Sequence, residues 1–269
     1  MDEDTFTLTF TPAELAFVAG TLGAAPKLLE DPFAGWPPER TEAALRQAQE
    51  ALAARQYIQV QPDGSMALDT TVAALVGALA FAEAALTVTR AVGAEEQPAA
   101  RRIHLAAGLL VEQEQQRDGS HGLTAVRDGE VVARRLKEYL RLAGQPAPPA
   151  QSWTLPASGV DEARYVAAVE GERACAEFLA GVGTPAAVAS SLAQALAHPV
   201  CQSALLALAW EAEEARRLDS LTLLESRHGL WLLHPLAGDD EPRLEVLPCD
   251  AAGAARRVEE LVRLVLGHG

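Results

Sequence analysis

DGEVVARRLKEYLRL (residues 128–142) and DAAGAARRVEELVRL (residues 250–264) are two stretches of one chain with the pattern of the same helix. Aligned without a gap, they are identical at seven of fifteen positions, at a constant separation of 122 residues. A composition this rich in alanine and leucine would give about one or two identities by chance. The match predicts an internal duplication in which each half of the chain closes with a copy of this helix.

Each copy carries an apolar stripe at helical spacing, which predicts a helix that covers a sheet. The stripe residues are Val132, Leu136, Tyr139 and Leu140 in the first copy, and Val258, Leu261, Val262 and Val265 in the second. The arginines outside the stripe stand four residues before glutamates, as Arg134 before Glu138 and Arg256 before Glu260. This spacing favours a solvated face with weak ion pairs over an anion site.

The first half begins with an order of elements like that of a winged helix. Thr11-Pro12-Ala13-Glu14 forms a capping box for a helix over 12–22, and a second helix runs from Pro37-Pro38 to about Arg55. Residues 57–69 predict a hairpin, after which Asp69 starts a third helix. Three strands, at 86–90, 103–113 and 121–126, then lead into helix 128–142.

The second half repeats this plan after a proline-rich linker at 146–149. Helices are expected from about Val160 to Gly181, from 185 to His198, and over VCQSALLALAWEAEEARRL to about Leu218. Strands at 220–227, 228–236 and 243–249 precede the last helix.

The sequence therefore predicts an α+β fold with two quasi-symmetric halves, 1–145 and 150–269, packed as one compact unit. Each half has helices, a three-stranded antiparallel meander and a closing helix, and the N-terminal segment is winged-helix-like.

Composition and charge bear on the kind of partner. The chain has 269 residues and a formal net charge of -15, a field that disfavours nucleic acid and anionic lipid surfaces. The second helix sets Arg40, Arg46 and Arg55 against Glu39, Glu42 and Glu50, so a winged helix here is better interpreted as a packing unit than as a DNA reader.

Cysteine usage and the N-terminus point to the cytoplasm. Cys175, Cys201 and Cys249 are dispersed and odd in number, which fits a reducing compartment without a disulfide framework. The first residues are acidic, and no apolar run reaches the roughly 20 residues that span a bilayer. We expect neither export nor membrane insertion.

Candidate chemistry is sparse. His228 and His234 are six residues apart on a predicted strand, which separates their rings by about 20 Å, too far for one metal ion even with Asp239, Asp240 and Glu241 nearby. Ser120-His121 lies in DGSHG, which is typical of a hairpin turn and lacks the GxSxG nucleophile elbow. GxGxxG, GxxxxGK[ST] and HExxH are absent. The sequence thus predicts no catalytic residue, no cofactor and no metal.

Several stretches together resemble the EspG family of ESX (type VII) secretion-associated proteins. They are LTFTPAELAFVAGTLGA, ALTVTR and DGSHGLTAV in the first half, and SLTLLESRHGLWLLHPL and RLEVLPCDAAGAARRVEELVRLV in the second. The resemblance implies a cytosolic α+β protein with a pseudo-two-fold arrangement that acts as a chaperone, holding secreted substrate pairs for delivery to a membrane machine. It transfers no catalytic motif and no binding residue.

We therefore expect a cytoplasmic, chaperone-like adaptor that binds a protein, which could be a secretion substrate. Trp36 and Trp153, both in predicted loops, are candidate anchors for the partner, with the alternative that each fills the core beneath its loop. Two other functions stay open. A small-molecule sensor or regulator would need a closed apolar pocket, and a hydrolase would need scattered catalytic residues that meet in a cleft.

Overall fold

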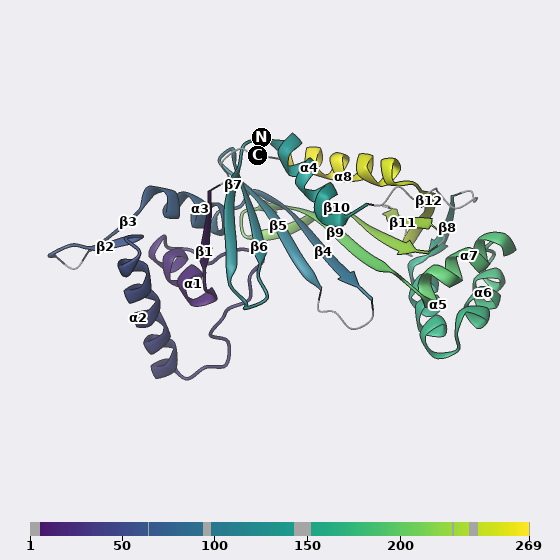
Figure 1. Cartoon of the computed structure of the whole chain (residues 1–269), viewed down its shortest axis with the longest axis horizontal. Coiled ribbons are helices and arrows are strands. Elements are labelled where there is room, and N and C mark those ends of the chain that lie inside the picture. The colour runs from purple at the N-terminus through teal and green to yellow at the C-terminus, as the bar shows by residue number, and fades with distance from the viewer. Residues whose placement is uncertain are drawn as a thin grey trace.

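The computed structural model describes residues 6–63, 65–93, 98–142, 152–227, 229–236 and 242–268, which form an α+β fold (Figure 1). The strands are β1 (Thr7–Phe10), β2 (Ile58–Val60), β3 (Met66–Leu68), β4 (Ala84–Val92), β5 (Ala99–Ala106), β6 (Leu109–Gln115), β7 (His121–Val126), β8 (Trp153–Pro156), β9 (Cys201–Glu211), β10 (Glu214–Ser226), β11 (Gly229–Leu236) and β12 (Arg243–Cys249). The helices are α1 (Pro12–Thr21), α2 (Pro38–Ala54), α3 (Thr70–Ala80), α4 (Gly129–Leu140), α5 (Ala157–Val169), α6 (Glu172–Gly181), α7 (Ala186–Ala197) and α8 (Ala251–Leu266). None of these helices has the length and apolar character needed to cross a membrane.

One antiparallel sheet of ten strands runs through the whole fold, in the order β1-β7-β6-β5-β4-β9-β10-β11-β12-β8. The two halves of the chain meet at its centre, where β4 pairs with β9 from Ala84 opposite Ala209 to Val92 opposite Cys201. Each half supplies a meander of four strands, and β1 and β8 form the two edges. The prediction of a three-stranded meander in each half is therefore wrong by one strand.

In the first half, the predicted strand 103–113 is in fact two strands. Ala107 and Gly108 both have positive φ, 47° and 75°, and form the tight turn between β5 and β6. Two consecutive positive φ angles are typical of the two-residue turns that suit a twisted hairpin. The apolar residues on both sides of this turn make the two strands look like one continuous run.

In the second half, the helix predicted to end near Leu218 is wrong, because these residues form β9 and the start of β10. Leu205 and Ala207 face the α8 side of the sheet, whereas Ala204 and Leu206 face the other side. Alanine and leucine favour a helix in isolation. Here β9 lies between β4 and β10 and pairs with both, so tertiary pairing overrides that local preference.

The N-terminal segment has the predicted order of helix, helix, hairpin and helix. The capping box of α1 is confirmed: the Glu14 amide donates to Thr11 Oγ1 at 3.2 Å, and the Thr11 amide donates to Glu14 Oε2 at 2.8 Å. Asp69 caps α3 by accepting from the amides of Thr71 and Val72. In the second half, the predicted helix 160–181 is divided into α5 and α6 at Gly171, whose φ of 90° interrupts the helix.

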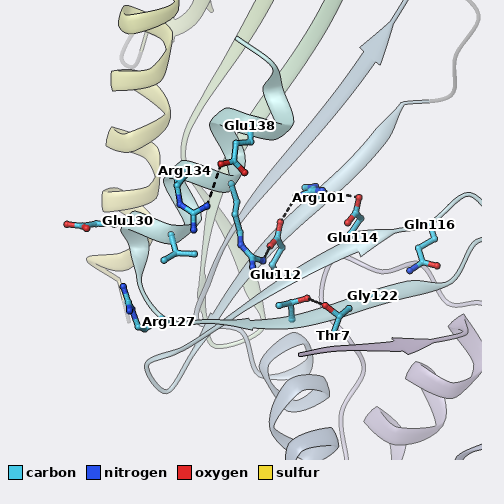
Figure 2. A pocket seen from close by; sticks show the side chains of 13 residues that line it. Thr7, Arg101, Glu112, Glu114, Gln116, Gly122, Arg127, Glu130, Arg134 and Glu138 are labelled. Atoms are coloured by element: carbon cyan, nitrogen blue, oxygen red, sulfur yellow. Dashed lines mark hydrogen bonds and ion pairs between the residues drawn. The ribbon is translucent and has the colours of Figure 1, made fainter. Parts of the chain in front are cut away.

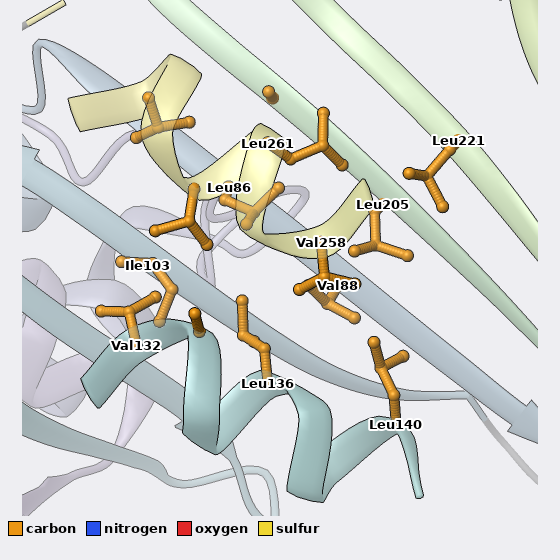
Figure 3. Packing of buried hydrophobic residues seen from close by; sticks show 14 of the residues in the cluster. Leu86, Val88, Ile103, Val132, Leu136, Leu140, Leu205, Leu221, Val258 and Leu261 are labelled. Carbon is orange, nitrogen blue, oxygen red and sulfur yellow. The ribbon is translucent and has the colours of Figure 1, made fainter. Parts of the chain in front are cut away.

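α4 and α8, the two copies of the repeated stretch, lie side by side on one face of the sheet (Figures 1 and 3). Their apolar stripes enter one core cluster together with β4, β5, β9 and β10. Lys137 of α4 and Glu259 of α8 form an ion pair at 2.9 Å. Near the start of α4, a Cβ on Gly129 would clash with Leu266 Cδ1, so the glycine permits close approach to the end of α8.

The outer faces of these two helices carry the ion pairs of exposed side chains. Arg134 and Glu138 pair at 3.5 Å across one turn of α4, as predicted. In α8, Glu260 pairs with Arg257 at 2.8 Å in place of the predicted Arg256.

The opposite face of the sheet is covered by helices at its two ends. α1–α3 form a core cluster with β1, β6 and β7, and α5–α7 form another with β8 and β10–β12. Trp231, fully buried, belongs to this second cluster. The predicted linker and domain boundary lie outside the described residues.

Candidate functional site

The middle of the sheet face opposite α4 and α8 is open in the described structure. It lies between the α1–α3 group at one end and the α5–α7 group at the other (Figure 1). Its side chains come from β4, β9 and β10 and are half-buried or exposed: Thr87, Thr89, Ala204, Leu206, Ser220 and Thr222. We call these six residues the open strip. It has no charged side chain and offers methyl and hydroxyl groups on a rigid sheet.

The two predicted anchors, Trp36 and Trp153, lie in different surroundings. Trp36 is 37% exposed in the loop between α1 and α2, and the Arg40 guanidinium stacks 3.9 Å from its ring centroid. Trp153 begins β8, is half-buried and makes an edge contact with Trp231, with ring centroids 5.9 Å apart. Trp36 thus offers surface to a partner, and Trp153 packs against the C-terminal core. A binding role for either remains a prediction.

Trp36 also lines a groove of about 1030 Å³ between α1, the loop from α1 to α2, and the sheet. Leu28, Leu29 and Phe33 of the loop supply further apolar surface, and the sheet supplies Arg102, Gln115 and His121. We call this the Trp36 groove. Because it combines apolar walls with a few polar groups, it has the character of a ligand or peptide site.

A chain of three buried polar side chains ends at this groove. His104 Nε2 lies 2.9 Å from Gln113 Oε1, and Gln113 Nε2 lies 3.1 Å from His121 Nδ1. Burial lowers the pKa of His104 to about 4. Burial, and then the charge of Arg102, lower the pKa of His121 as well. Both rings are therefore neutral near pH 7, and the Gln113 amide accepts from one ring and donates to the other.

Ser120 lies in a hairpin turn, as predicted from its sequence. Its hydroxyl donates to Asp118 Oδ1 at 2.6 Å, and the Gln116 amide donates to the Ser120 carbonyl at 2.8 Å. The neighbouring imidazole of His121 is engaged by Gln113. The serine thus stabilises the turn, and no hydrogen bond links its hydroxyl to a histidine among the described residues.

The remaining candidates for metal or thiol chemistry are dispersed. His234 Nε2 lies 2.9 Å from Asp219 Oδ1, while His228, Asp239, Asp240 and Glu241 lie outside the described residues. Among the residues that are described, no three histidine, cysteine or acidic side chains gather as a metal site would require.

The cysteines are separate from one another. Burial raises the pKa of the Cys175 thiol to about 11 and that of Cys249 to about 12, and the charges of Glu172 and Asp250 add to this. Thiols with raised pKa are poor nucleophiles and poor metal ligands at neutral pH.

A charged groove of about 880 Å³ lies between α4 and the strands β1, β5, β6 and β7 (Figure 2). Glu112, 5% exposed, accepts from Arg101 at 2.7 Å and from Arg135 at 2.6 Å. Arg101 also reaches Glu114 at 3.1 Å. Four arginines and four glutamates line the groove, so their charges offset one another and give no net attraction for an anion.

Comparison with known proteins gives a match in structure alone. The fold superposes on that of the Mycobacterium tuberculosis type VII secretion system chaperone EspG5, solved in complex with a PE25–PPE41 dimer. The match has a TM-score of 0.69 at 15% sequence identity, and it covers 98% of this chain and 96% of that one. No family model and no curated protein matches the sequence. The chain shares the fold of EspG5.

This match confirms the resemblance seen in the sequence at the level of the fold. At 15% identity it places no binding residue, so the open strip and the Trp36 groove rest on the geometry of this chain. Sequence analysis missed Arg102, Gln113 and the groove. The available signal was the alternation of polar residues, Arg102 with His104 on one strand and Gln113 with Gln115 on the next, which places each pair on one face of a sheet.

Proposed function

We propose that this chain is a cytoplasmic, chaperone-like adaptor that holds a secretion substrate or another protein and catalyses no reaction. The observation that carries the proposal is the match to EspG5 along nearly the whole chain, in a structure where EspG5 is bound to a PE25–PPE41 dimer. A fold does not by itself determine a function. The dispersed cysteines and the engaged Ser120 and His121 fit a binding role better than a catalytic one.

The partner is proposed to dock on the open strip and the loops at its ends. A protein interface of standard size needs about 800 Å² on each partner, which favours a broad face over a single pocket. The strip carries no charged side chain and lies on strands paired on both sides, so docking there strips no charged group of this chain of water and requires little ordering of its backbone. The charge of -15 would steer basic surfaces of the partner toward it at low salt.

We further propose that the chain is an internal repeat of two quasi-symmetric halves, 1–145 and 150–269, packed as one unit. Outward from the β4–β9 pair, the sheet has β5, β6, β7 and β1 on one side and β10, β11, β12 and β8 on the other. The ion pair between Lys137 and Glu259 joins two residues 122 positions apart, the same offset as the sequence repeat. In this arrangement the winged-helix-like N-terminal segment is a packing unit.

Capture from a cytosolic extract of the producing organism tests the adaptor function. The tagged chain should retain a protein in stoichiometric amount, with more retained at low salt than at high salt. Ala204→Arg, in the open strip, should abolish retention, because it places a long charged side chain on the docking face. Ala252→Arg, exposed on α8 across the sheet, is the matched control and should retain the partner.

Two results would contradict this proposal in different ways. Recovery of DNA, or of no protein while a turnover assay gives activity, would remove the adaptor function. Retention of the partner by Ala204→Arg would leave the adaptor function standing but show that the partner binds elsewhere.

A further inference from the structure

We infer that the Trp36 groove binds a carboxylate side chain carried within an apolar segment of the protein partner. Arg102 supplies the charged contact, and His121 supplies a second hydrogen-bond donor. That this segment belongs to a protein partner rests on the proposed function. The chemistry of the groove is argued from its own residues.

Arg102 is the first reason for assigning a carboxylate. Its side chain makes no hydrogen bond and no ion pair within the described residues, and its Nη1 is buried without a partner. Burial lowers the pKa of its guanidinium, which nevertheless stays ionised. The next residue along the strand, Arg101, pairs with both Glu112 and Glu114.

This contrast matters because acidic residues are abundant in the chain. Asp and Glu number 37 against 22 Lys and Arg, so a cation without a carboxylate partner does not follow from a shortage of acids. A partly buried charge is costly unless it is paired. The Arg102 guanidinium is therefore a cation with which a carboxylate from outside the chain would form an ion pair.

His121 is the second reason. Its Nδ1 accepts from the Gln113 amide, so the proton of the neutral ring is on Nε2. Within the described residues Nε2 has no hydrogen-bond partner, and His121 lines the groove beside Arg102. The floor of the groove thus offers a cation and a neutral N–H donor, a set that suits an anionic acceptor.

The walls of the groove define the rest of the occupant. Phe33 and Trp36 meet edge to face, with ring centroids 5.8 Å apart, and present apolar surface. Lys27 holds this loop on α3 and the residues after it, because its amide donates to Leu79 O at 2.9 Å and its Nζ donates to Ala82 O at 3.0 Å. The aromatic wall is therefore already in place before a ligand binds.

Two further features favour a segment with a single carboxylate that belongs to a protein. Glu30 and Asp31 also line the groove and are exposed, so a second acidic group would be repelled there. Arg102 is the cross-strand neighbour of Thr87 and shares its sheet face, which makes the groove continuous with the open strip. A segment bound at Arg102 can continue onto the docking face.

Fluorescence anisotropy with a synthetic peptide tests the inference without the natural partner. The probe is a labelled, end-capped peptide Ala-Leu-Glu-Phe-Leu-Ala, and its control has glutamine in place of glutamate. We expect the first to bind with a Kd below about 1 mM and the second about tenfold or more weakly. Arg102→Gln should remove this difference, while Arg117→Gln, an exposed arginine in the β6–β7 turn, should keep it.

Folding of the variant is checked by its melting temperature, which should not fall, because the Arg102 guanidinium has no partner to lose. Arg102→Lys keeps the charge without the forked geometry and should bind the glutamate peptide with intermediate affinity. Equal binding of the two peptides, or full binding by Arg102→Gln, would overturn the inference. Binding of octanoate without binding of the peptide would also overturn it, since the groove would then be a small-molecule site. The capture experiment tests the proposed function separately, whichever result the peptides give.

Discussion

Truncation of Leu136 to alanine tests whether the two halves of the chain form one cooperative unit. Leu136 is fully buried at the centre of the cluster beneath α4 and α8, where both halves contribute side chains (Figure 3). A buried Leu→Ala change costs about 3 to 5 kcal/mol, as the lost transfer free energy plus the cavity that remains. Because Leu136 has no exposed surface, we expect a value near the middle of this range, about 4 kcal/mol.

Urea denaturation measures this change. For a chain of this length the free energy of unfolding falls by about 3 kcal/mol per molar urea or more, so Leu136→Ala should lower the midpoint by about 1 M. Leu236→Ala is the matched control, because Leu236 is 40% exposed at the end of β11 and should cost less than about 1 kcal/mol.

Intrinsic fluorescence reports on the half that does not contain the mutation. Trp153, Trp210 and Trp231 belong to residues 150–269, whereas Leu136 belongs to α4 in the first half. Trp36 is the fourth tryptophan and lies in the first half, so it is replaced by phenylalanine in both proteins that are compared. If the β4–β9 pair and the shared cluster join the halves, the urea midpoint of the tryptophan fluorescence transition should fall by the same amount, about 1 M. An unchanged tryptophan midpoint would refute the reasoning, since it would mean that the second half unfolds independently.

Three further predictions concern buried polar groups. Glu112→Gln should lower the free energy of unfolding by about 1 to 3 kcal/mol, because Arg101 and Arg135 both lose their charged acceptor. Its control, Glu138→Gln on the exposed face of α4, should cost less than about 1 kcal/mol. Equal costs of the two changes in urea titrations would contradict this prediction. The free energy of unfolding should fall as pH drops from about 6.5 to 4, by up to about 3 kcal/mol from His104, because its folded pKa of about 4 makes the unfolded chain bind the additional proton. His104→Gln should flatten that slope, and an unchanged slope in urea titrations at pH 7 and 4.5 would count against the assignment. Burial raises the pKa of all three cysteine thiols, so they should react slowly with iodoacetamide at pH 7.5 and rapidly once the chain is unfolded in guanidinium. Mass spectrometry follows the reaction. A thiol that reacts equally fast in both conditions would be inconsistent with the fold.

The sequence predicts best those elements whose signals are local. The Thr11 and Asp69 caps, the hairpin at 57–69 and the stripes of α4 and α8 all depend on contacts within a few residues, and each is present in the structure. Such signals do not depend on the rest of the fold.

The prediction failed where pairing between distant residues decides the conformation. β9 has the composition of a helix and is a strand because it pairs on one side with β10 and on the other with β4, more than a hundred residues earlier. The turn at Ala107 was missed because an alanine there has the positive φ usually taken by glycine or asparagine. The Trp36 groove could not be predicted at all, since it joins a loop near residue 30 to strands beyond residue 100.

The edges of the sheet explain why a partner would bind its face. A long, regular edge strand invites another chain to pair with it. Here β1 and β8 are each four residues long, and β8 ends at Pro156, which has no amide hydrogen to donate. Both edges are therefore poor templates for strand addition. The central strands β4 and β9 are long, rigid and paired on both sides, so recognition on the open strip relies on side chains. Specificity must then come from groups at its margin, and Arg102 is a charged side chain placed there.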